Sequence, residues 1–150
     1  MAQQVVDLGT TADDGTGDSL RAGGQKINDN FTELYAQIGA NKYGTITGID
    51  VATGTLGVSF TPYSGDVSSA QLTSIAGNAS TIRITLSSAM ASTSYLVKTY
   101  VESLSGTISS DTAIGSVVFK PISTTVFDVC IEEFASNVQN IKLHFEIIQK

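Results

Sequence analysis

The chain has 150 residues, a formal net charge of −6 and charged side chains at only 15% of its positions. This length holds one hydrophobic core of ordinary size, so we expect a single globular domain with an N-terminal arm. An acidic surface repels phosphate, which argues against a nucleic-acid partner. No apolar run approaches about 18 residues, and the start, MAQQVVDLG, lacks the layout of a signal peptide. We therefore expect no membrane insertion, and synthesis in a cytoplasm.

The first apolar segment is Val5–Leu8, which precedes a glycine-rich loop. It could form an edge strand of a sheet or an arm that grips a neighbouring protein, and its short length favours the arm. The side chains that would make the contact are Val5, Val6 and Leu8. Residues 1–17 are predicted to form this attachment arm.

The loop Gly9–Gly17 holds Asp13 and Asp14 and is followed by Asp18, an acidic group that suggests a calcium site. The spacing does not follow the order of an EF-hand loop, and no bidentate Glu follows it. We expect Asp13 and Asp14 to hydrogen-bond the backbone of a turn instead. No metal ion and no cofactor are predicted.

The only long helical pattern in the chain begins near Asp18. Its apolar positions recur at spacings of four and three, which is the a/d seam of a heptad repeat. The seam consists of Leu20, Gly24, Ile27, Phe31, Leu34 and Ile38. Asp18 and Ser19 can accept hydrogen bonds from the first turn, and Gly39 can close the helix, so a helix over residues 18–39 that ends at about Ile38 is predicted.

Two interpretations of this helix remain open. It could be one amphipathic helix on a sheet of its own chain, with Tyr35 widening the apolar stripe. It could also be a short parallel coiled coil between identical chains. Three heptads alone are marginal, and Gly23 and Gly24 cost about 1 kcal/mol each relative to Ala, so the coil would need support from the rest of the molecule. Ile27 at a d position and Phe31 at an a position favour a trimer over a tight dimer.

The trimer interpretation assigns five apolar side chains to the interface between chains. These are Leu20, Ile27, Phe31, Leu34 and Ile38.

After a linker at Gly39–Gly44, the apolar period changes to two, which is typical of strands. Thr45–Val51 and Thr55–Phe60 are predicted to form a hairpin in which Gly54 adopts a positive φ. A weaker strand is expected around Gln71–Ile75. Further strands are expected at 82–86, 95–102, 113–120, 124–133 and 140–149. Pro121 stops the third of these because proline cannot donate to a central ladder.

The last two strands are predicted to pair as an antiparallel hairpin. In the register that joins their apolar faces, Phe127 lies opposite Ile147, Val129 opposite Phe145, and Ile131 opposite Leu143. Seven or eight short strands without a second helix indicate a mostly β fold. We expect an antiparallel β-sandwich of jelly-roll type over residues 45–150, preceded by the arm and the helix.

The search for chemistry finds no catalytic residues. In the predicted register Cys130 lies opposite His144, but a catalytic dyad also needs an orienting group, an oxyanion site and a pocket. One cysteine gives neither an intrachain disulfide nor a zinc framework. The sequence has no GxSxG, GxxxxGK, HExxH or CxxC motif, and we expect the protein not to be an enzyme.

The run from Val6 to Tyr35 reads VDLGTTADDGTGDSLRAGGQKINDNFTELY. Its apolar strand, Gly-Thr pair, polar loop, GDSLR, KIN-NF and ELY resemble the N-terminal signature of bacteriophage virion proteins found in tail fibres, tail spikes and head appendages. The resemblance implies a structural role in a homotrimeric virion appendage, with the signature near the attachment end. Gly23 and Gly24 stand where this family usually has Ala and an apolar residue.

Three functions remain open. The first is a virion structural protein, a tail fibre, head fibre or capsid decoration, that is attached to other virion proteins by its arm and projects a β-sandwich knob. The second is a receptor- or carbohydrate-binding module for host adsorption, in which Tyr100 contacts a surface glycan while Tyr95 is in the core. The third is an enzyme such as a surface depolymerase, for which the sequence offers no acid pair or triad.

Overall fold

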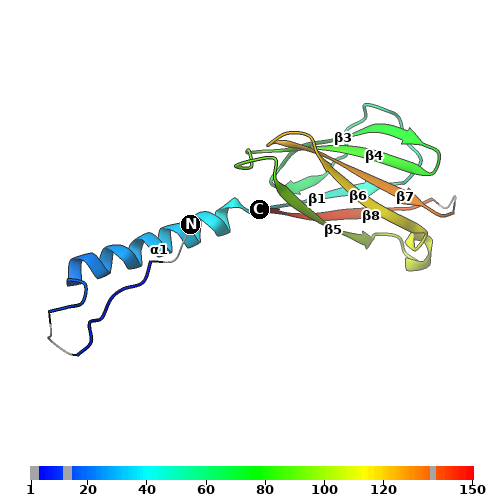
Figure 1. Cartoon of the computed structure of the whole chain (residues 1–150). Helices are drawn as coiled ribbons and strands as arrows, with labels where there is room; N and C mark the ends of the chain where they lie inside the picture. Colours follow the sequence, from blue (N-terminus) through cyan, green and yellow to red (C-terminus); the bar gives the residue numbers. More distant parts are fainter. Residues whose placement is uncertain (1–3, 12–14, 136–137) are drawn as a thin grey trace. The chain divides into compact units, whose positions relative to one another are not determined.

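The computed structural model describes residues 4–11, 15–135 and 138–150, without the side chains of residues 37–39 and 110. Asp13 and Asp14, and with them the predicted turn hydrogen bonds, lie outside the described residues. The chain divides into two compact units, Met1–Ala40 and Asn41–Lys150. Figure 1 shows that the first contains the helix and the second contains all the labelled strands.

In the N-terminal unit the helix α1 spans Leu20–Ala40. The Ser19 hydroxyl accepts a hydrogen bond from the Ala22 amide at 3.2 Å, which is the geometry of an N-cap. The predicted end at about Ile38 is two residues early, because Gly39 continues the helix. A glycine can close a helix but does not have to, and helix ends are the least predictable part of an element.

The second unit is a sandwich of two four-stranded antiparallel sheets, which confirms the predicted mostly β fold (Figure 1). The strands are β1 (Lys42–Ile49), β2 (Tyr63–Gly65), β3 (Val67–Ala76), β4 (Ala79–Leu86), β5 (Tyr95–Ser103), β6 (Ile114–Pro121), β7 (Val126–Glu133) and β8 (Ile141–Gln149). Sheet A has the order β2-β1-β8-β5 and sheet B the order β3-β4-β7-β6. A short 3₁₀ helix, Ile108–Asp111, lies between β5 and β6.

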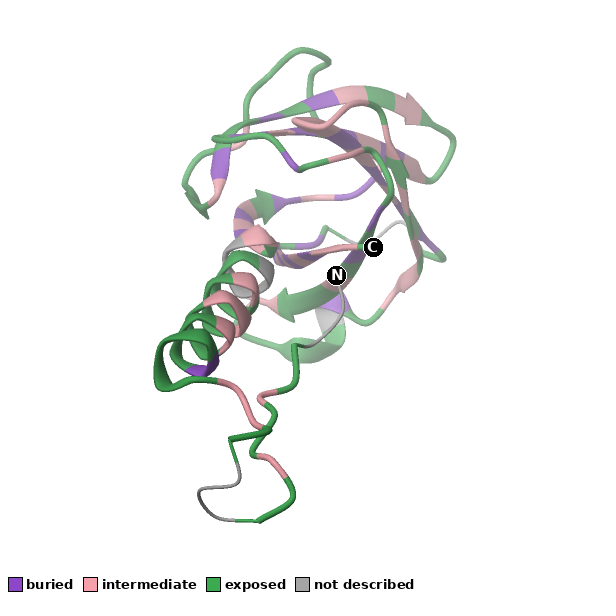
Figure 2. Cartoon of the chain, turned by 60° about the vertical axis from the view of Figure 1, so that its left-hand side comes forward, coloured by how far each residue is buried: buried purple, intermediate pink, exposed green. Residues whose placement is uncertain are grey.

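The hydrophobic core lies between the inner faces of the two sheets. Along β8 every second residue from Ile141 to Ile147 is buried, and along β7 the same holds from Phe127 to Ile131. The rings of Phe127 in sheet B and Phe145 in sheet A meet edge to face with centroids 5.2 Å apart. Figure 2 shows the resulting alternation of buried and exposed segments along the strands.

The predicted hairpin between the last two strands is wrong. β7 pairs with β4 and β6 in sheet B, whereas β8 pairs with β1 and β5 in sheet A. The apolar faces of β7 and β8 do meet, but across the sandwich and not along one ladder. Alternation identifies the buried face of a strand but not the sheet to which the strand belongs.

This topology also separates Cys130 from His144, so their predicted juxtaposition is wrong. Cys130 lies between Thr81 and Val118 on the outer side of sheet B. His144 lies on the outer side of sheet A, with Thr45 on one neighbouring strand and Tyr100 on the other.

The predicted hairpin over residues 45–60 is also wrong. β1 starts at Lys42, inside the expected linker, and pairs with the short strand β2, so residues 50–62 connect them. Ala52 at φ 61° and Gly54 at φ 101° turn the chain within this connection, and Ser59 makes only an isolated bridge to Gln71. The glycine has the expected positive φ, but it belongs to a loop and not to a hairpin turn.

A stronger hairpin occurs where the sequence predicts only a weak strand. β3 is ten residues long and joins β4 through Gly77 and Asn78. Gly77 has φ 59°, which suits the first central position of a two-residue hairpin turn. β4 begins three residues before its predicted range of 82–86. The strands β5 to β8 agree with their predicted ranges to within two residues, and Pro121 ends the edge strand β6.

Candidate functional site

The N-terminal arm, defined here as residues 4–9, runs back along α1 and is hydrogen-bonded to it. The Gln4 amide donates to Asn30 Oδ1 at 3.0 Å, and Asn30 Nδ2 donates to the Gln4 carbonyl at 2.8 Å. One turn closer to the helix start, Lys26 Nζ donates to the Val5 carbonyl at 3.1 Å. An extended segment with free main-chain groups thereby finds partners on side chains of the helix.

Asp18 fixes the arm where the helix begins. Its amide donates to the Asp7 carbonyl at 2.8 Å, and its carboxylate accepts from the Asp7 amide at 2.9 Å. The same carboxylate forms an ion pair with Lys26 Nζ at 2.7 Å. The hydrogen bond from Lys26, and then that from Asp7, lower the pKa of Asp18 below its ordinary value.

Two glycines allow the arm to approach this closely. A Cβ at Gly17 would lie 2.8 Å from the Asp7 carbonyl oxygen and the Gly9 nitrogen. A Cβ at Gly23 would lie 3.2 Å from Cγ1 of Val6, and Gly23 is buried. Gly23, one of the two glycines that depart from the pattern of similar sequences, is therefore the place where Val6 packs on the helix.

The arm contacts one side of α1 and leaves the heptad seam uncovered. Its helix partners Gly23, Lys26 and Asn30 occupy g and c positions, beside the seam. The seam side chains remain exposed, as the green and pink helix in Figure 2 illustrates. Their exposed fractions are 96% for Leu20, 46% for Ile27, 52% for Phe31 and 48% for Leu34. The side chain of Ile38, the fifth predicted interface residue, lies outside the described residues.

The predicted contact residues of the arm divide into two groups. Val6 is partly buried against Gly23, so it holds the arm on its own helix. Val5 and Leu8 are exposed at 73% and 87%, so they are available to another protein.

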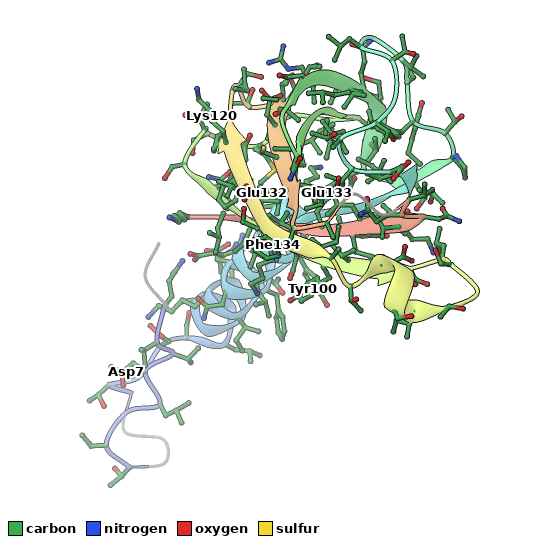
Figure 3. The ribbon with its side chains drawn as sticks, turned by 90° about the vertical axis from the view of Figure 1, so that its right-hand side faces the viewer. Asp7, Tyr100, Lys120, Glu132, Glu133 and Phe134 are labelled. Atoms are coloured by element: carbon green, nitrogen blue, oxygen red, sulfur yellow. The ribbon has the colours of Figure 1, made fainter. Side chains whose placement is uncertain are left out.

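Tyr100, the predicted ligand contact, lies on the outer side of β5 and is 61% exposed (Figure 3). Tyr95 lies on the inner side of the same strand, where its hydroxyl donates to the Ser123 carbonyl at 3.0 Å and burial raises its pKa. Both placements agree with the alternation of the strand.

The charged groups around Tyr100 are paired with one another. Glu102 Oε2 lies 2.6 Å from His144 Nε2 and 3.0 Å from Lys142 Nζ. The hydrogen bonds from His144 and then from Lys142 lower the pKa of Glu102. Among the described residues, no group of three or more His, Cys, Asp or Glu side chains could hold a metal ion.

The most buried polar side chains outside this surface organise loops of the sandwich. Asp111 accepts hydrogen bonds from Ser103, Ser105 and the Asn140 amide. Burial raises its pKa, but the bonds from Ser103, Asn140 and Ser105 together bring it below the ordinary value. Glu133 accepts from Gln139, whose side-chain oxygen in turn accepts from the Val51 amide at 3.0 Å, beside a cavity of about 260 Å³. Figure 3 labels Glu133 where β7 ends.

The sequence analysis missed the side chains that dock the arm. The sequence indicates a helix cap or part of an acidic group for Asp18, and parts of a motif for Lys26 and Asn30. One feature of the sequence could have indicated them: the extended arm is about as long as the first turns of the helix. Polar residues on one side of a helix, beside an apolar seam, can bond a strand that folds back over them.

Two kinds of comparison relate the chain to known proteins. A sequence model of the family described as "Bacteriophage T4 gp9/10-like protein, N-terminal" matches residues 3–118. The baseplate wedge protein gp10 of Enterobacteria phage T4 is 57% identical over 37 residues, which cover 25% of this chain and 6% of that protein. The chain thus spans only a small part of the length of this relative. No solved structure matches it, and the described part of the chain has no helix long and apolar enough to cross a membrane.

Proposed function

The chain belongs to the family of bacteriophage T4 gp9/10-like proteins, and on this premise we propose that it is a virion structural protein that trimerises through α1. In this role the N-terminal unit attaches to other virion proteins and the β-sandwich forms a projecting knob. The function is assembly, without a cofactor and without catalysis.

The exposed seam of α1 is the observation that carries the proposal. Leu20, Ile27, Phe31 and Leu34 repeat at heptad spacing, and the arm lies beside them without covering them. Burying each large apolar side chain between chains is worth about 1.5–3 kcal/mol before entropic costs. A parallel bundle of identical helices covers all copies of the seam at once, because every chain presents the same face.

The arm supplies the support that three heptads lack. An isolated helix of this length is marginal in water, and two adjacent glycines weaken it further. The bonds that join Gln4 and Val5 to the helix, with the bond between Asp7 and Asp18 just before it, extend along several turns and hold the helix in place. Trimer formation is then linked to the folding of the N-terminal unit.

The relative named baseplate wedge protein supports a place for this chain among tail components. From this relative we infer for this chain only a role in assembly. In that role the exposed arm side chains Val5 and Leu8 contact a neighbouring virion protein. Whether the virion position is a tail fibre, a baseplate or a head fibre is a further choice within the same proposal.

Light scattering behind a sizing column tests the trimer. We expect three times the chain mass of 15.7 kDa for the intact protein, and the mass of one chain for the double variant Ile27→Asp with Phe31→Asp. Thr32→Asp is the control, because it places one of these negative charges on the exposed b position of the same helix. If the double variant remains a trimer, the assembly surface is not α1.

A second role in host adsorption has one observation in its favour, the exposed ring of Tyr100. Binding of the intact protein to a panel of bacterial surface glycans tests it, with Tyr100→Ala as the variant that should lose the signal and Tyr43→Ala as the control. Equal binding by both variants contradicts a role for Tyr100.

A further inference from the structure

We propose that the arm of each chain docks against the α1 helix of a second copy, through an ion pair between Asp7 and the neighbour's Arg21. The inference rests on the proposed parallel trimer and assigns to the arm a contact that the trimer alone does not require. The occupant of this surface is a second copy of the chain.

The first observation behind this contact is the side of the helix on which the arm lies. Gly23 and Asn30, which contact the arm, are g positions, whereas Lys26 at c and Asp29 at f, which also bond the arm, lie further from the seam. In a parallel coiled coil the g side of one helix faces the e side of its neighbour. The arm therefore lies at the groove between two helices, next to the e positions of the second copy.

The second observation is that Asp7 and Arg21 lie at similar heights along the helix axis. Its amide and carbonyl are both bonded to Asp18, so Asp7 lies beside the helix start. Arg21 is the e residue of the first turn. Because parallel identical helices are in register, the neighbour's Arg21 lies at the height at which Asp7 is held.

The third observation is that Asp7 and Arg21 have opposite charges. Asp7 is exposed, and one of its carboxylate oxygens accepts from the Gly9 amide at 2.9 Å, which orients the group and leaves the other oxygen for a partner. Arg21 is also exposed, and among the described residues it makes no ion pair. The planar guanidinium can form two parallel hydrogen bonds with a carboxylate, and its fixed fork reduces the side-chain entropy lost per bond.

The apolar part of the contact comes from Val5. Val6 faces the helix of its own chain at Gly23, and Val5, its neighbour in the extended arm, is exposed. Alternate side chains of an extended segment point to opposite sides, so Val5 is on the side away from its own helix. Asp7 shares that side, which gives the arm an inward residue and two outward residues for the second copy.

The test is charge reversal in the full-length protein. The trimer is dissociated by urea, which leaves ion pairs unscreened, and its mass is followed by light scattering. Asp7→Arg and Arg21→Asp should each raise the trimer dissociation constant about tenfold, because three exposed pairs are lost together. The double variant with both changes should recover most of the wild-type value, and the differences should shrink in about 0.5 M salt.

Two further variants separate this contact from damage to the fold. Asp7→Asn keeps the acceptor for the Gly9 amide but loses the charge, so it should weaken the trimer as Asp7→Ala does. Ala22→Asp adds a negative charge in the same turn at an f position, away from the neighbour, and should leave the trimer unchanged.

The outcomes distinguish this inference from the proposal on which it rests. One outcome is a wild-type trimer whose dissociation constant is raised by each single reversal and is not restored by the double reversal. In that case the proposed arm contact is wrong and the proposed trimer is kept. If the wild type is a monomer at every concentration, the trimer is wrong and the arm contact falls with it.

Discussion

The two units of this chain differ in the burial of their apolar side chains. In the β-sandwich, inner-face residues such as Phe127, Ile131 and Leu143 are fully buried by the other sheet of the same chain. In the N-terminal unit, the heptad side chains of α1 are exposed although they are equally apolar. The first pattern describes a fold that is complete in one chain, and the second is the pattern on which the proposal of assembly through α1 rests.

The comparison predicts the largest effect for a substitution in the sandwich core. Phe127→Ala removes a buried ring that packs edge to face on Phe145 and should lower the free energy of unfolding by about 3–5 kcal/mol. Urea unfolding followed by circular dichroism measures the change. Tyr43→Ala, an exposed aromatic position of the same sandwich, is the control and should cost much less. Equal losses would contradict the assignment of the core.

In the N-terminal unit the arm depends on a close backbone approach. Gly17→Ala puts a Cβ within 2.8 Å of the Asp7 carbonyl, so the arm has to move and its bonds to Asp18 should open, at a cost of about 1–3 kcal/mol. Hydrogen exchange at the amides of Asp7 and Asp18 measures the loss. Gly24→Ala meets no atom within 4 Å and should stabilise the helix by about 1 kcal/mol. Protection that is unchanged in Gly17→Ala would contradict the docked arm.

Acid should release the arm from the start of α1. The folded pKa of Asp18 is lowered, so its contribution is fully present above its unfolded pKa of about 3.8 and is lost as the pH falls through the lower folded value. Exchange of the Asp7 amide should therefore accelerate below about pH 4. Asp18→Asn should remove this pH dependence, whereas Glu146→Gln, a change in the sandwich at a carboxylate that pairs with Lys98, should leave it in place. If the Asp7 amide exchanges as fast at neutral pH as below about pH 4, the ionised carboxylate of Asp18 does not hold the arm.

The smallest effect is expected on the outer face of sheet A. Glu102 bonds His144 and Lys142, but all three groups are in contact with solvent, and exposed ion pairs add little to stability. Glu102→Gln should leave the urea midpoint within experimental error. A large shift would mean that this face is covered in the assembled protein.

Local patterns in the sequence predicted most elements but not their pairing. The alternation of Ile82, Ile84 and Leu86, and that of β8, identified the buried side of each strand. The same alternation could not assign β7 and β8 to different sheets, because both register and sheet membership depend on contacts between distant segments. Ala52 was overlooked because a non-glycine residue at positive φ has no sequence signal of its own.

The candidate site shows the same limit. Heptad spacing identified the seam, since a helix with one apolar stripe needs only its own sequence to be recognised. The arm contacts depended on the chain folding back over α1, so the pairing of Gln4 with Asn30 and of Asp7 with Asp18 had no periodic signature. Gly23 was interpreted as a weakness of the helix, whereas it makes room for Val6.

The most direct test of the account is the solution mass of the intact protein beside that of a chain that starts at Asn41, by light scattering over a range of concentrations. We expect a trimer for the intact protein and a monomer for the truncated chain, because the exposed seam lies in the removed unit. A trimer that survives the truncation, or a monomer in both cases, would contradict assembly through α1.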